Sequence, residues 1–266
     1  MKKKIIIFSG LVIVFSFSTY SVTNWESDNV KEEVVCKEIE KTENQMMSII
    51  NAQLAPKVFY DVASRFIWTI TLEDLDKAKS IRDVVPKDAL GTVISYDEVK
   101  VSLFDEDDDK NVIGKEGNFN SGQLELLESL NYSSNFYVHA YYQKRNEITG
   151  EVQDEYLVYY ITVVPKYEAE YLAGSENLLD YIKMNCKKHE SEIEEGELKA
   201  GKVIFMVNKS GNVDNVRLMS SSGNLGLDTE IQKIISELPN EWRPARNGEG
   251  KKVSQELTIS FGIIGC

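Results

Sequence analysis

The chain has 266 residues, of which 42% are hydrophobic and 10% aromatic, so it is long enough for two or three domains with packed cores. Its 43 acidic side chains against 30 lysines and arginines give a net charge of −13. Because nucleic-acid binding needs a basic face that neutralises phosphates, this balance argues against a nucleic-acid partner.

The first 21 residues have the pattern of an export signal. Met1 to Lys4 is positively charged, residues 5–17 are apolar, and small residues follow at 18–21. Extended to Val22, the apolar stretch is about 18 residues long, close to the lower limit for a membrane span. The sequence therefore predicts an exported protein of the periplasm or cell envelope. It leaves open whether residues 1–21 are a cleaved signal peptide or an anchor in the inner membrane.

Residues 22–57 are expected to form a helical stalk or linker. Apolar residues recur only loosely between Val30 and Leu54, many charges lie between them, and Pro56 ends the stretch. The methionines and isoleucines between Met46 and Ile50 are typical of a packing surface rather than of a ligand site.

Residues 58–167 are expected to form a separate α+β or sandwich-like domain. A hydroxyl followed three residues later by a carboxylate occurs at Thr71 with Asp74 and at Ser80 with Asp83, which is typical of helix N-caps. Ser121 is the expected cap of a further short helix.

Three stretches of this domain, 99–103, 136–142 and 156–164, have the composition of strands, and a turn at 148–151 separates the last two. Their tyrosines are expected to form a core on one face of the sheet, with an exposed interface as the alternative. These tyrosines are Tyr137, Tyr141, Tyr142, Tyr156, Tyr159 and Tyr160.

No pattern of residues indicates catalysis, a cofactor or a metal. The acidic run Asp105–Asp109 with Glu116 has some of the spacing of a calcium loop, but Lys110 stands where that loop needs glycine, so a solvated hairpin turn is expected. Cys186 and His189 lack the second pair that a tetrahedral zinc site requires. The chain contains neither a nucleophile elbow nor a dinucleotide fingerprint.

The chain has three cysteines, Cys36, Cys186 and Cys266. In an oxidising compartment two of them could pair, and Cys186 with Cys266 is the first pair to test because both belong to the C-terminal part of the chain. One thiol then stays free, and the sequence leaves the pairing open.

Residues 168–266 contain a regular succession of elements. Gly201–Val207 and Val213–Ser220 are expected strands around a turn at 208–212, and residues 253–261 an expected final strand. The intervening helix presents one apolar face formed by Leu227, Ile231, Ile234, Ile235 and Leu238, and Pro239 ends it.

The final strand alternates apolar and polar side chains, so one face is expected in the core and the other in solvent. The apolar set is Val253, Leu257, Ile259 and Phe261, and the polar set is Ser254, Glu256, Thr258 and Ser260.

In this order the elements resemble the TonB C-terminal domain family. The residues that carry the resemblance are Gly201, Gly211, Ser221, Ser222, Gly223, Leu227, Asp228, Leu238, Pro239, Trp242, Pro244, Ala245, Asn247 and Gly248. The resemblance implies a three-stranded antiparallel sheet covered by two helices. It also implies an envelope protein that binds outer-membrane receptors and passes force to them. Trp242 is expected to pack in the corner between Pro239 and Pro244.

In the resembling family the last strand lies at the edge of the sheet, where an extended peptide can pair with its backbone. The resemblance therefore implies a partner-binding segment at Val253, Ser254, Gln255, Glu256, Leu257, Thr258 and Ile259. The alternative is that the middle domain, or a second copy of the chain in a homodimer, covers this edge.

The function that the sequence predicts is that of an exported, non-enzymatic binding protein of the cell envelope, which takes up receptor peptides by strand addition. The alternative is a periplasmic structural or assembly protein, and a buried final strand would favour it. Energy transducers of the family have a histidine in their anchor and a long proline-rich spacer. Residues 5–17 contain no histidine and the whole chain has five prolines, so proton-driven transduction is not expected.

Overall fold

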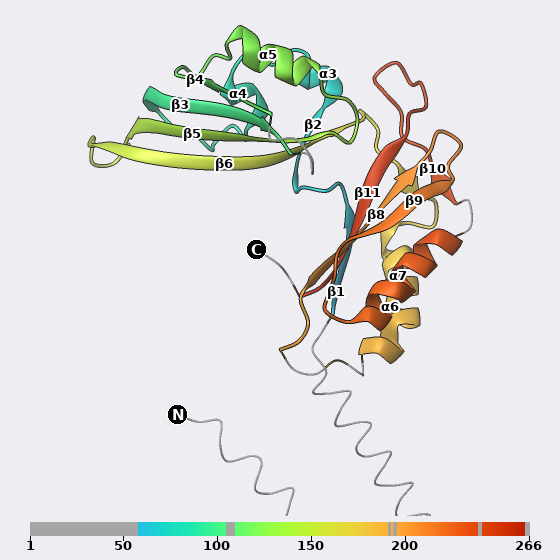
Figure 1. The fold of residues 1–266 in the computed structure, drawn as a ribbon. Coiled ribbons are helices and arrows are strands. Elements are labelled where there is room, and N and C mark those ends of the chain that lie inside the picture. The colour runs from blue at the N-terminus through green and yellow to red at the C-terminus, as the bar shows by residue number, and fades with distance from the viewer. Residues whose placement is uncertain (1–57, 105–109, 191–192, 194–195, 239–240, 264–266) are drawn as a thin grey trace, which may run out of the picture. The chain divides into compact units, whose positions relative to one another are not determined.

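The computed structural model describes residues 58–104, 110–190, 193, 196–238 and 241–263 (Figure 1). The expected signal or anchor, the expected stalk and the acidic run 105–109 lie outside the described residues. The described chain is α+β, as predicted, with five helices and three sheets. No helix within these ranges has the length and hydropathy needed to cross a membrane.

The first large sheet has five strands and is covered on one face by three short helices (Figure 1). Its strands, in spatial order, are β2 (Trp68–Thr71), β6 (Val152–Val164), β5 (Asn135–Arg145), β3 (Val93–Leu103) and β4 (Asn111–Gly114). Only β2 and β6 run parallel; the other neighbours are antiparallel. The helices are α3 (Leu72–Leu75), α4 (Ile81–Val84) and α5 (Ser121–Glu128).

Side-chain caps begin these short helices. Thr71 accepts the Asp74 N–H at 3.2 Å, and the Asp83 carboxylate accepts the Ser80 N–H at 2.8 Å, so both predicted caps are confirmed. The cap of α5 is Asn120, which exchanges two hydrogen bonds of 3.0 Å with Gln123. The prediction that Ser121 caps this helix is therefore wrong by one residue, because the amide of Asn120 completes the capping box.

The tyrosines of β5 and β6 do not form a core on one face, so that prediction is wrong. Tyr142 is 3% exposed among the buried side chains on the helix side, whereas Tyr141, Tyr156 and Tyr160 are 47%, 54% and 44% exposed. Successive side chains of a strand point to opposite faces, so neighbouring tyrosines separate. The core consists of aliphatic and phenylalanine side chains such as Val99, Val101, Phe136, Val138 and Ile161.

The second large sheet has four strands, with α6 (Ser175–Glu190) and α7 (Leu225–Glu237) on one face (Figure 1). Its strands, in spatial order, are β1 (Phe59–Ala63), β11 (Gln255–Gly262), β8 (Ala200–Val207) and β9 (Val213–Ser220). A short ribbon of β7 (Glu170–Tyr171) and β10 (Trp242–Arg243) accompanies it. We call this unit the C-terminal domain.

The expected count of three strands in this domain is wrong, because β1 adds a fourth. β1 pairs antiparallel with β11 over five residues, from Phe59 opposite Gly262 to Ala63 opposite Thr258. Tyr60 is buried in the core of this domain, and its hydroxyl donates to Glu190 at 2.7 Å. Burial and this hydrogen bond raise the pKa of the Tyr60 phenol. The stretch expected to open the middle domain thus completes the other sheet.

The expected helix face of α7 is confirmed. Leu227, Ile231 and Ile235 are fully buried, with Ile234 and Leu238 nearly so, and they pack with residues of β8 and β11 such as Phe205 and Ile259. The last strand deviates from its expected alternation at Thr258, which is only 2% exposed. Thr258 lies opposite Ala63 on one side and Ile204 on the other, so the additional strand removes it from solvent.

A buried carboxylate connects the end of β9 to α7. Asp228, 1% exposed, accepts hydrogen bonds from the hydroxyls of Ser221 at 2.6 Å and Ser222 at 2.7 Å and from the Ser222 N–H at 2.9 Å. Asn224 caps the helix by accepting the Leu227 N–H at 2.9 Å. The serine pair and the aspartate therefore fix the angle at which the helix leaves the strand.

We predict that Ile231→Ala lowers the free energy of unfolding by about 2 to 5 kcal/mol, because it leaves a cavity in the core. Ile148→Ala is the matched control, since Ile148 is 96% exposed. Urea unfolding measures both, and a loss below about 1 kcal/mol for Ile231→Ala would contradict the assigned core.

We also predict that Asp228→Ala destabilises the chain by about 1 to 3 kcal/mol, because two hydroxyls and one N–H then lack their acceptor. Asp180→Ala removes an exposed carboxylate of α6 and should change stability by less than about 0.5 kcal/mol. Equal losses for the two variants in thermal unfolding would show that the Asp228 hydrogen bonds do not stabilise the fold.

Candidate functional site

The predicted partner-binding residues lie in and just before β11, but β11 is not an edge strand. Val207 to Ala200 of β8 pair with β11 along one side, and Ala63 to Phe59 of β1 pair with its residues 258–262 along the other. The prediction that the last strand forms the edge of the sheet is therefore wrong. Its physical cause is β1, which occupies the backbone positions at which a partner strand was expected.

The residues before this double pairing already have partners. The Gln255 side chain, 1% exposed, accepts the Ala169 N–H at 2.7 Å and donates to the Glu168 carboxylate at 2.6 Å. The Glu256 N–H donates to the Ser133 hydroxyl at 2.8 Å, and its carboxylate pairs with Arg217 at 3.0 Å. Leu257 and Val253 are buried, while Ser254 is half-buried. These side chains support the fold.

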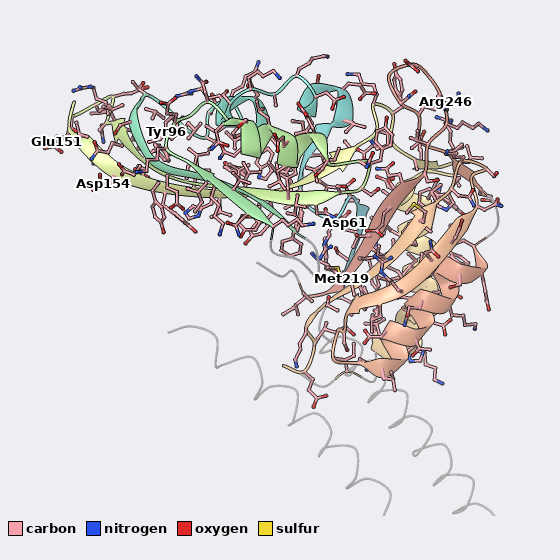
Figure 2. The ribbon with its side chains drawn as sticks, turned by 45° about the horizontal axis from the view of Figure 1, so that its top comes forward. Asp61, Tyr96, Glu151, Asp154, Met219 and Arg246 are labelled. Carbon is pink, nitrogen blue, oxygen red and sulfur yellow. The ribbon has the colours of Figure 1, made fainter. Side chains whose placement is uncertain are left out.

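The edges of this sheet, within the described residues, are β1 and β9, and Figure 2 labels Asp61 and Met219 on them. β9 is irregular: its pairing with β8 shifts register twice, and Asn215 has a φ of 53°, in the left-handed region. Such bulges twist an edge and hinder the pairing of a further strand. β1 pairs with β11 without a register shift, so its outer side is the more regular edge.

A hollow of about 620 Å³ lies beside the end of β1. Its walls come from the end of β1, the stretch that follows it, β7, the start of α6, and single residues of β10 and β11. The side chains used below are Asp61, Val62, Glu168, Glu170, Trp242 and Leu257. The wall contains three carboxylates and no lysine, arginine or histidine.

These three carboxylates differ in their surroundings. Glu170 pairs with Arg243 at 2.6 Å, and Glu168 accepts hydrogen bonds from two neutral donors, Ser64 at 2.9 Å and Gln255 at 2.6 Å. Asp61 is exposed on the edge strand, and no ion pair of this side chain occurs among the described residues. The uncompensated charge of the hollow is negative, which favours a cationic group.

Trp242 forms the apolar end of the hollow and is also part of the core. Its ring lies 5.4 Å from the rings of both Tyr171 and Phe205. The indole N–H is buried and has no acceptor among the described residues. Gly211, with a φ of 87°, lies against the Trp242 carbonyl, where a Cβ would overlap it. The expected packing of Trp242 in a corner is confirmed for the side of Pro244; Pro239 lies outside the described residues.

Other motif positions serve the fold. Gly201 lies under the ring of Phe261, whose atoms approach a would-be Cβ at 2.6 Å, and Gly223 turns the chain with a φ of 88°. The Gly248 N–H donates to the Glu73 carboxylate at 2.6 Å. These contacts give structural reasons for the glycines that carried the resemblance.

The cysteine and metal expectations concern α6. Cys186 is a fully buried free thiol, and burial raises its pKa to about 12, so it is protonated at neutral pH. Cys36 and Cys266 lie outside the described residues. Within the described ranges, no three histidine, cysteine or acidic side chains are grouped so that they could hold a metal ion.

Sequence reasoning missed β1 as part of the site. Phe59, Tyr60 and Val62 are residues that favour strands, so the run from 58 to 63 carries a signal for a strand. No local signal in that run identifies β11, almost 200 residues away, as its partner.

Comparison with known proteins gives one match. No curated protein and no solved structure matched the chain. The residues matched by a family model, 195–263, include β8, β9, α7, β10 and β11, whereas β1 and the five-stranded sheet lie outside the match. This family is described as the Gram-negative bacterial TonB protein C-terminal, so the C-terminal domain carries a TonB C-terminal segment, as its motifs indicated.

Proposed function

We propose that this chain is an exported, non-enzymatic protein of the Gram-negative cell envelope whose C-terminal domain binds extended peptide segments by strand addition. The match at residues 195–263 implies a TonB-like envelope protein of a binding family. The proposed partner is a peptide of an outer-membrane receptor or of another envelope protein. The proposed location is the periplasm, with residues 1–21 as signal or inner-membrane anchor.

The pairing of β1 with β11 is the observation that carries this proposal. The family match contains three strands of the sheet, and the fourth comes from a segment more than 130 residues before the matched region. The backbone of β11 thus accepts an extended strand from outside the family segment. Main-chain hydrogen bonds of this kind depend little on sequence, so a peptide of suitable shape can form them as well.

Two modes of strand addition are compatible with this arrangement. A peptide could replace β1 on β11, or it could extend the sheet at the outer side of β1. Replacement requires the burial of Tyr60 and its hydrogen bond to Glu190 to be given up, which opposes it. Addition at a free edge leaves the core intact.

A structural or assembly role is the second candidate function. The observation that favours it is the burial of β11 between β1 and β8, which satisfies this part of the sheet within the chain. In that role the C-terminal domain would connect segments of its own chain and its neighbours without capturing receptor peptides. Failure of the full chain to retain outer-membrane receptors in a pull-down would favour this second role.

We predict that receptor-derived peptides protect backbone amides of an edge strand of the four-stranded sheet from hydrogen exchange in the full chain. Two versions of each peptide, N-methylated at odd or at even positions, form the control. An added strand directs alternate N–H groups to the sheet, so one version should lose binding and the other should retain it.

Mass spectrometry after exchange locates the protected amides. Equal binding by both methylated versions, or a complex without added protection in β1, β9 or β11, would contradict strand addition.

A further inference from the structure

Resting on the proposed function, we propose that the outer edge of β1, together with the hollow beside it, is the binding site for an extended peptide that carries basic side chains. This assigns the partner segment to β1 rather than to the last strand. It also assigns the chemical class of the peptide.

The backbone of β1 provides the edge. β1 is the terminal strand of the sheet and pairs with β11 on one side only. Each residue of an antiparallel edge strand directs its N–H and C=O groups either to its neighbour or outward, in alternation. The outward groups of β1 can pair with a further strand, and the bulged edge at β9 is less suited to do so.

The hollow provides room for side chains of the added strand. Val62 of β1 and Leu257 of β11 line it, and both pack with the core on the helix-covered face of the sheet. Alternate side chains of a strand beside β1 would point to this same face. A hollow of about 620 Å³ has room for more than one such side chain.

Charge decides which peptide fits. Asp61, Glu168 and Glu170 contribute carboxylates to the wall, only Glu170 has a described basic partner, and no basic side chain lines the hollow. A lysine or arginine of the peptide would neutralise this charge, whereas a glutamate would be repelled. The buried Trp242 N–H, without an acceptor among the described residues, would gain one from a carbonyl group that enters the hollow.

The test uses the full chain and a fluorescent peptide of alternating valine and lysine, with a valine–glutamate peptide of equal length as the comparison. Asp61→Lys is the principal variant, and Asp61→Asn removes the charge with a smaller change. Glu151→Lys is the matched control, because it changes the net charge equally at the exposed turn before β6 (Figure 2). Circular dichroism verifies that each variant is folded.

We expect the lysine peptide to bind more tightly than the glutamate peptide, with amides of residues 59–64 gaining protection from exchange. Asp61→Asn should weaken binding by about 5-fold and Asp61→Lys by more, whereas Glu151→Lys should have little effect. Added salt should reduce the preference for the lysine peptide.

Two results would overturn the inference. The first is that the two peptides bind equally well or that Asp61→Lys and Glu151→Lys weaken binding equally, since the attraction would then be a property of the whole acidic chain. The second is that a receptor peptide protects β9, or displaces β1 and exposes residues 59–63, in which case strand addition holds at another edge. Absence of binding by any extended peptide would refute both this inference and the proposed function.

Discussion

The antiparallel pairing of β1 with β11 determines how the described chain is organised. It joins residues 59–63 to residues 258–262, so the strands, helices and turns between them form one closed loop. Closing a loop costs conformational entropy, but this cost grows only with the logarithm of loop length. Buried Tyr60 and the backbone ladder offset it. The five-stranded sheet is therefore an insertion between two parts of the C-terminal domain.

Local features of the fold were predictable from the sequence. The hairpin of β8 and β9, the apolar face of α7, and the caps at Thr71 and Ser80 depend on residues a few positions apart, so their patterns are legible in one short window. The position of β11 was not predictable, because it depends on a partner almost 200 residues away. Thr258 illustrates this: its polar side chain predicted exposure, and the distant strand buries it.

The candidate site has the same non-local character. Asp61, Glu168 and Trp242 come from three separate segments, and only the folded sheet brings them to one hollow. The sequence identified Trp242 through its place in a family motif and predicted a structural role for it, which its contacts with Tyr171 and Phe205 support. The acidic residues carried no signal in a chain with 43 acidic side chains.

The direction of β1 also has a mechanical consequence. In the antiparallel register Phe59 lies opposite Gly262, so the chain enters the first strand and leaves the last strand at the same end of the ladder. Tension between the segment that precedes Phe59 and the segment that follows Gly262 would load the hydrogen bonds one after another, from this end, like the teeth of a zip. Tension on a strand bound to the outer side of β1 and directed along its axis would instead load several bonds together in shear. The same sheet would yield to a small force in the first geometry and resist a larger one in the second.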